Sequence, residues 1–152
     1  MAMAILLLVE DGKLKLDDSA GKFLPTLPLA WKPVTIRQLL SHTSGIPDFE
    51  EVMGYGAYRN VWLPDKVIAT VATQPMDFVP GTNWHYSNTG YFVLTLILEK
   101  VAGEPYVSFV QKRILEPAGM TRTRSSEPTE IIPGRAAGYE FAKGRLENRD
   151  PL

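Results

Sequence analysis

The sequence contains no cysteine, so disulfide bonds, thiolate metal sites and cysteine nucleophiles are excluded within its 152 residues. Histidine is also scarce, because the chain has only His42 and His85, and these stand far apart in the sequence. Two distant histidines without cysteine do not match the ligand spacing of a zinc site. We therefore expect no metal ion and no cofactor.

The sequence also lacks an excess of charge of either sign. The formal net charge is -1 at pH 7, and no stripe of lysine or arginine offsets it locally, which argues against nucleic-acid binding. The apolar start of the chain, residues 1–9, is too short to span a bilayer, and no basic segment precedes it. We interpret this start as a core helix and expect no membrane span.

The hydrophobic pattern is mainly helical. With 45% hydrophobic and 22% charged residues, the composition is that of a globular chain with one domain. Thr35 and Gln38 have the spacing of a capping box, which marks a helix start. Pro64 suits the first turn of another helix that runs to about Gln74, and Pro105 opens a further amphipathic helix.

The stretch after Asn88 is apolar on almost every side as far as Gly103, which predicts the most deeply buried helix of the chain. From Thr121 onward the sequence is polar and irregular by contrast. Residues 136–141 offer one short strand there, and we expect it to pair with a segment outside the chain. The fold class expected for the chain is therefore mainly α.

Tyr86, Ser87 and Asn88 stand where an extended stretch turns into this buried helix. Backbone N–H groups at a helix N-terminus lack partners and favour anions, so the triplet is a candidate site for chemistry. Serine and asparagine are also common N-cap residues, and a tyrosine ring can simply pack beneath such a turn. The triplet by itself leaves the functional and the structural interpretation open.

Other candidate catalytic residues that are neighbours in the sequence give a less specific signal. Histidine and serine are near neighbours at 42–44 and again at 85–87, but closeness in sequence does not establish a catalytic pair. We interpret His42 as a residue that makes structural hydrogen bonds. The adjacent acidic residues Asp17–Asp18 and Glu50–Glu51 are interpreted as turn and solvent-facing residues rather than as paired catalytic carboxylates.

Four blocks of the sequence, in this order and spacing, resemble the serine β-lactamase and penicillin-binding-protein superfamily. The similarity is to its branch of class C β-lactamases, esterases and DD-peptidases. The resemblance implies an α/β fold in which a helical region packs beside a central sheet, with the active site between them. The blocks are AILLLVEDGKLKLDD (Ala4–Asp18), TIRQLLSHTSGIPD (Thr35–Asp48), PGTNWHYSNTGY (Pro80–Tyr91) and ILEPAGMTRT (Ile114–Thr123).

By this resemblance, Tyr86 and Asn88 occupy the positions of the family's Tyr-x-Asn motif. The motif tyrosine shares proton handling with a motif lysine, and the asparagine orients that lysine and the substrate. A nearby cation favours the phenolate form of a tyrosine, which fits this role. Trp84 adjoins Tyr86 and is a further candidate for substrate binding, although tryptophan is more often a packing residue.

The family's nucleophilic serine and its lysine lie in a Ser-x-x-Lys motif just before the helix with which this chain begins. No serine precedes Ser19 here, and no lysine precedes Lys13. The family's Lys-Thr-Gly or His-x-Gly strand is also absent. We therefore expect residues 1–152 to be a single partial domain, the helical part of a longer serine hydrolase, and to be inactive alone.

The resemblance implies that the longer parent hydrolyses β-lactams, D-amino-acid peptides or small esters through an acyl-enzyme. Two alternatives remain open. The chain is then either a non-catalytic module that binds ligands with the helical half of the cleft, or an interaction module that self-associates through exposed apolar surface. Members of this branch are commonly exported, so the resemblance implies an exported parent, and the compartment stays open.

Overall fold

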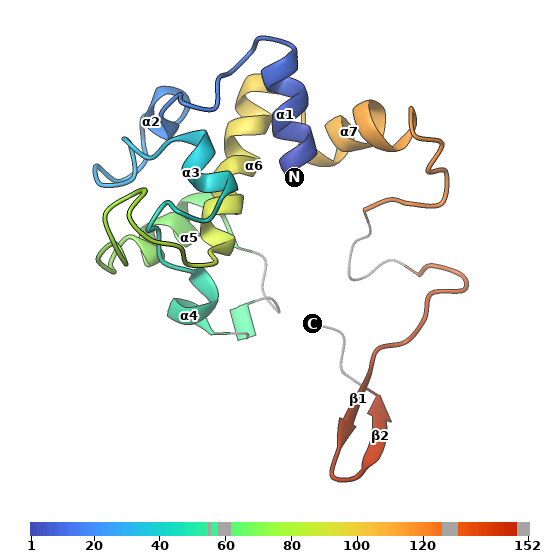
Figure 1. Ribbon diagram of the computed structural model, residues 1–152. Coiled ribbons are helices and arrows are strands. Elements are labelled where there is room, and N and C mark those ends of the chain that lie inside the picture. The colour runs from blue at the N-terminus through green and yellow to red at the C-terminus, as the bar shows by residue number, and fades with distance from the viewer. Residues whose placement is uncertain (55, 58–61, 126–130, 149–152) are drawn as a thin grey trace.

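The computed structural model describes residues 1–54, 56–57, 62–125 and 131–148. Within these ranges the chain forms a body of packed helices and, near the C-terminus, a two-stranded sheet (Figure 1). The mainly helical fold class expected from the sequence is confirmed. In chain order the elements are α1 (Ala2–Glu10), α2 (Ala20–Phe23), α3 (Ile36–Leu40), α4 (Phe49–Met53), α5 (Pro64–Val71), α6 (Asn88–Ala102), α7 (Tyr106–Val110), the π-helical turn η2 (Gln111–Leu115), β1 (Tyr139–Ala142) and β2 (Arg145–Asn148).

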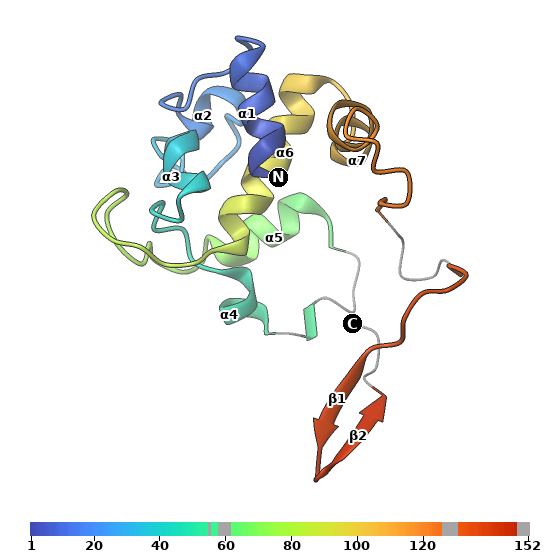
Figure 2. The same cartoon turned by 45° about the vertical axis from the view of Figure 1, so that its right-hand side comes forward.

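Helix α6 is the centre of the body. It contacts α1, α2, α3, α4 and α7, and both views show α1 lying alongside it (Figure 1, Figure 2). Its buried residues, among them Leu94 and Ile97, recur at helical spacing, and Gly103 ends the helix in the left-handed conformation at φ 72°. The predicted deeply buried helix is confirmed. Neither α6 nor any other described helix is long and apolar enough to cross a membrane.

Helix α3 begins with the predicted capping box. The Gln38 backbone N–H donates to Thr35 Oγ1 at 3.2 Å, and the Thr35 N–H donates to Gln38 Oε1 at 3.0 Å. After α3 the chain turns sharply at His42, whose φ of 57° lies in the left-handed region.

The segment that follows α3 runs beside the segment that precedes α6. The Gly81 N–H donates to the Thr43 carbonyl at 2.8 Å, and the His85 N–H donates to the His42 carbonyl at 3.0 Å. These backbone hydrogen bonds bring the second and third sequence blocks together at the N-terminus of α6.

Three helical details differ from the predictions. Helix α5 ends at Val71, short of Gln74. The helix after Pro105 divides into α7 and the π-helical η2. Residues 50–51, interpreted from the sequence as a turn, lie in α4, where Asp48 is the N-cap and accepts from the Glu50 N–H at 3.2 Å. That cap supplies the local stabilisation which lets an acidic segment begin a helix.

The strand expected near residues 136–141 is present as β1, but the expectation of a partner outside the chain is wrong. Strand β1 pairs antiparallel with β2, so that Phe141 lies opposite Leu146. Lys143 and Gly144 have φ of 52° and 76°, which gives the two-residue turn that joins hairpin strands. Strand β2 carries no clear sequence signal, because glutamate and asparagine are depleted in strands.

Candidate active site

The triplet of residues 86–88 lies at the N-terminus of α6. Ser87 is the N-cap; its side chain is buried, and its Oγ accepts a hydrogen bond from the Gly90 N–H at 3.1 Å. Tyr86 is 52% exposed, and its Oη donates to Asn88 Oδ1 at 3.0 Å. The triplet is thus divided into a buried capping serine and an accessible pair of tyrosine and asparagine.

Two carboxylates from the start of α4 hold the Asn88 amide. Asn88 Nδ2 donates to Asp48 Oδ2 at 3.0 Å and to Glu50 Oε1 at 3.1 Å. Because a carboxylate only accepts, both amide hydrogens are directed to these oxygens and Oδ1 faces Tyr86. Asp48 is only 5% exposed. The interpretation of Glu50 as a solvent-facing turn residue is wrong, since it contacts the site.

Asp48 and Glu50 are not predicted as site residues by the sequence. They precede Asn88 by 40 and 38 residues, so no local pattern connects them with it. The one available signal is that Asp48 closes the second family-like block as a potential N-cap. The connection is made by the backbone hydrogen bonds between the segments that follow α3 and precede α6.

The imidazole ring of His42 packs between the tyrosine rings of the site. Its ring centroid lies 4.7 Å from that of Tyr91 and 4.6 Å from that of Tyr86. Its Nδ1 accepts from the Ser87 N–H at 3.2 Å, which places the ring proton on Nε2. Burial lowers the pKa of His42, against the opposing effect of the Asp48 carboxylate. His42 is therefore a neutral structural group, the role expected from the sequence.

The second histidine, His85, is held between two carboxylates. Its Nδ1 lies 2.9 Å from Asp77 Oδ2, and its Nε2 lies 3.3 Å from Glu51 Oε1. The hydrogen bond to Asp77 raises the pKa of His85, and the negative charges of Glu51, Asp77 and Asp48 act in the same direction against partial desolvation. When it is protonated, the imidazolium donates from both nitrogens and ties α4 to the segment before Tyr86.

Neither histidine–serine neighbour forms a catalytic pair. Ser44 and Ser87 are both 2% exposed. Ser44 Oγ accepts from the Ile46 N–H at 3.2 Å, and Ser87 Oγ is engaged as the helix cap. Among the described residues, no three histidine or acidic side chains are grouped so that they could hold a metal ion.

One run, Ser19 to Lys22, has the literal Ser-x-x-Lys spacing, but it lies away from Tyr86. Ser19 is bridged to Thr35 at the N-terminus of α3, whereas the Tyr86 ring lies tilted against His42 beyond the other end of that helix. A helix of five residues separates those ends by roughly 8 Å, beyond hydrogen-bond reach. Lys22 Nζ is paired with Asp18 at 2.7 Å.

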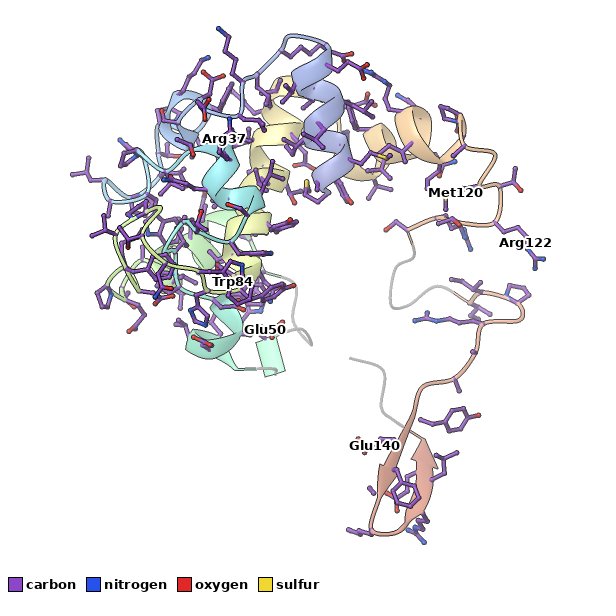
Figure 3. The ribbon with its side chains drawn as sticks, viewed as in Figure 1. Arg37, Glu50, Trp84, Met120, Arg122 and Glu140 are labelled. Carbon is purple, nitrogen blue, oxygen red and sulfur yellow. The ribbon has the colours of Figure 1, made fainter. Side chains whose placement is uncertain are left out.

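Trp84, the candidate substrate contact, lies at the same end of the body. Its ring is 61% exposed and meets the His42 ring edge to face, with 6.3 Å between centroids. Figure 3 labels Trp84 and Glu50 on the helical body, whereas Arg122 and Glu140 lie away from it on the C-terminal segment.

Comparison with known proteins assigns the chain to a family. A family model described as beta-lactamase matches residues 1–151. The chain belongs to the beta-lactamase family. Within it, the penicillin-binding protein PbpX of Bacillus subtilis (strain 168) is 38% identical over 141 residues, which are 93% of this chain and 34% of PbpX. Protein flp of Staphylococcus aureus (strain N315) is 31% identical over 143 residues, which are 91% of this chain and 28% of flp.

Solved structures agree with this beta-lactamase-family fold. A penicillin-binding protein from Bacillus halodurans has a TM-score of 0.82 at 30% identity, over 97% of this chain and 46% of that one. The D-amino acid amidase of Ochrobactrum anthropi SV3, solved with L-phenylalanine amide, has a TM-score of 0.79 at 32% identity, over 93% and 41%. The resemblance drawn from four sequence blocks is confirmed. The chain spans about a third of the length of these curated relatives.

Proposed function

We propose that residues 1–152 form a single partial domain that supplies the helical half of the active site in a serine hydrolase. The observation that carries this proposal is the hydrogen bond from Tyr86 Oη to an Asn88 amide that Asp48 and Glu50 hold in one orientation. An accessible phenol beside a fixed amide is what proton transfer at a defined position requires.

The pair takes two roles in acyl transfer, which needs an activated hydroxyl, a proton carrier and donors for the oxyanion. Tyr86 is the proton carrier: its hydroxyl donates to Asn88, and within the part of the chain that the structure describes no donor is bonded to its oxygen, which can therefore accept. Asn88 Oδ1 keeps a second lone pair that can accept from an ammonium or a substrate N–H. Trp84 contacts the substrate, because its exposed ring shares the His42 surface with Tyr86.

Three serines considered above, Ser19, Ser44 and Ser87, are not assigned as the nucleophile. Ser44 and Ser87 are buried and bonded to backbone N–H groups, and Ser19 lies at the other end of α3. The proposal therefore assigns the nucleophile to a separate Ser-x-x-Lys segment and expects the 152-residue chain alone to be inactive. The proposed substrates are β-lactams, D-amino-acid peptides or esters, supported by relatives named as penicillin-binding proteins and a D-amino acid amidase.

The test compares the 152-residue chain with a chimera that adds the Ser-x-x-Lys segment and closing strands of PbpX. With nitrocefin and p-nitrophenyl acetate, we expect a product burst from the chimera and none from the chain alone. Tyr86→Phe should lower the kcat/KM of the chimera by about 100-fold or more. Tyr91→Phe is the control, because that hydroxyl donates to the Leu40 carbonyl outside the pair. Full activity of the Tyr86→Phe chimera would remove Tyr86 from the mechanism.

The second candidate is a non-catalytic binding module. The exposed rings of Trp84 and Tyr86 favour it, since accessible aromatic side chains are typical anchors of binding surfaces. A folded chimera that binds a β-lactam in NMR titration, yet gives no burst with either substrate, would support binding over hydrolysis.

A further inference from the structure

The β1–β2 hairpin stands away from the helical body, outside the proposed active site (Figure 1, Figure 2). Its register places Tyr139, Phe141 and Leu146 on one face, and these side chains are 58%, 75% and 68% exposed. The other face is charged. Two strands with an uncovered apolar face are only marginally stable in water, so this hairpin gains from further strand pairing.

Strand β2 offers a free edge for such pairing. Residues 143–144 form a two-residue turn, so the closing pair, Ala142 and Arg145, exchanges backbone hydrogen bonds. Pairs alternate along an antiparallel ladder, and the next pair, Phe141 and Leu146, therefore directs its N–H and C=O groups outward. The described sheet has only these two strands, which leaves the Leu146 edge of β2 without a neighbour.

We propose that β2 pairs antiparallel with β2 of a second copy of this chain, about a two-fold axis at Leu146. The two Leu146 residues then lie opposite each other and satisfy their outward backbone groups. Arg145 of each copy lies opposite Glu147 of the other, because a two-fold axis repeats each contact. Opposite charges directly across two strands stabilise their pairing. The apolar faces join on one side of a four-stranded sheet.

Charge complementarity selects β2 rather than β1 for this contact. A two-fold pairing of β1 centred on Glu140 would oppose two glutamates, which destabilises a sheet. A pairing centred on Phe141 would place Glu140 opposite Ala142 and gain no ion pair. On β2, the side chains of Arg145 and Glu147 are 76% and 32% exposed, so a second copy can reach both.

Sedimentation velocity over a micromolar to near-millimolar concentration range measures the association. Two short strands bury little surface, so we expect a weak, reversible dimer. Arg145→Glu alone and Glu147→Arg alone each turn both cross-strand ion pairs into like-charge pairs and should raise the dissociation constant about tenfold. An unmodified chain that stays monomeric throughout would overturn the proposal.

A mixture of these two variants separates pairing between copies from pairing within one hairpin. Arg145 Nε and Glu147 Oε1 also pair within one chain at 2.6 Å, and neither variant can form that internal pair. A mixed dimer nevertheless opposes acidic and basic side chains at both positions. We expect the mixture to recover the dissociation constant of the unmodified chain to within about threefold. No recovery overturns the proposal.

Glu140→Arg is the matched control, because it makes the same change of charge on the same face but lies on β1. Glu140→Arg keeps both cross-strand ion pairs and should dimerise with itself like the unmodified chain, so a fluorescent label on Arg145→Glu follows the mixed dimer. That mixed dimer regains only one of the two ion pairs, so it should form more weakly than the mixed dimer of Arg145→Glu with Glu147→Arg. Equal recovery in both mixtures would mean that net charge drives association, which overturns the register.

Amide hydrogen exchange gives an independent readout. The exchange rate of the Leu146 N–H should fall as the protein concentration rises, and the exchange rate of the Phe141 N–H should not. An exchange rate at Leu146 that does not depend on protein concentration would also overturn the proposed pairing.

Discussion

At the residue scale, Asp48 has two separable roles. Its Oδ1 caps α4 by accepting from the Glu50 N–H at 3.2 Å, and its Oδ2 accepts from Asn88 Nδ2 at 3.0 Å. A substitution that keeps the cap and removes the second acceptor therefore isolates the contact that orients Asn88.

Asp48→Ser is that substitution, since serine is a good N-cap residue. It leaves one Asn88 amide hydrogen without its acceptor, so we expect the free energy of unfolding to fall by about 1–2 kcal/mol. Asp48→Ala removes the cap as well and should cost about 1 kcal/mol more. Urea unfolding measures both. The control is Asp65→Ser in the first turn of α5, for which a change below about 0.5 kcal/mol is expected; equal losses at both positions would contradict the assignment.

The two histidines respond to pH in opposite directions. Asp77 and Glu51 raise the pKa of His85 above 6.5, so its stabilising contribution is complete below pH 6.5 and is lost as the pH rises through the folded-state pKa. Burial lowers the pKa of His42 below 6.5, so the folded state is favoured above pH 6.5 and loses that advantage as the pH falls.

His85→Gln tests the first of these assignments, because glutamine is polar but cannot become charged. We expect this change to lower the free energy of unfolding more at about pH 5.5 than at about pH 8.5. The effect should be modest, since the ring is 41% exposed and its ion pairs are screened by solvent. Urea unfolding of both proteins at the two pH values measures it. A loss that is the same at both values, or larger at the higher one, would rule out the charged pairing.

At the element scale, Gly45 fixes the two segments that build the site. Its φ is 71°, and its carbonyl accepts from the Asp77 N–H at 2.9 Å. A Cβ at this position would collide with the carbonyl oxygen of Phe78, which is backbone and cannot move aside. Only glycine therefore lets the segment after α3 approach the segment before α6 so closely.

Gly45→Ala should lower the free energy of unfolding by more than about 2 kcal/mol, through left-handed strain and the collision together. Gly12→Ala is a matched control, because φ is also 71° but nothing lies within 4 Å of an added Cβ. Strain alone should cost about 1 kcal/mol there. Chemical denaturation of the two variants gives the comparison. Similar losses would mean that the close approach of Gly45 to Phe78 adds nothing to the free-energy cost of the substitution.

The elements that the sequence predicts are those with local signals. The capping box at Thr35 and the apolar run of α6 depend only on residues that are close together in the sequence. Helix α4 is not, because part of its support comes from another element: the Phe49 N–H donates to Thr89 Oγ1 at 2.8 Å. The acidic partners of Asn88 and the pairing of β1 with β2 likewise depend on contacts that a single sequence does not display.

At the scale of the whole molecule, the apolar core ends before the hairpin. Every buried hydrophobic side chain of the described ranges lies between Ala4 and Phe109, whereas large apolar residues such as Ile131 are exposed further on. Arg113 forms a two-pronged ion pair with Asp11, at 2.8 and 3.0 Å, which joins η2 to the end of α1. The helical body is therefore closed by η2, and its stability should not require the C-terminal segment.

A chain that ends at residue 125 should accordingly unfold like the full 152-residue chain. We expect its free energy of unfolding, measured by urea titration at a concentration where both chains are monomeric, to agree within about 0.5 kcal/mol. Leu94→Ala in the shortened chain is the positive control, because Leu94 is fully buried in α6 and should cost about 2–5 kcal/mol. A clearly less stable shortened chain would mean that residues 126–152 support the core. An equally stable one makes the helical body an autonomous folding unit, on which the hairpin acts only as an attachment surface.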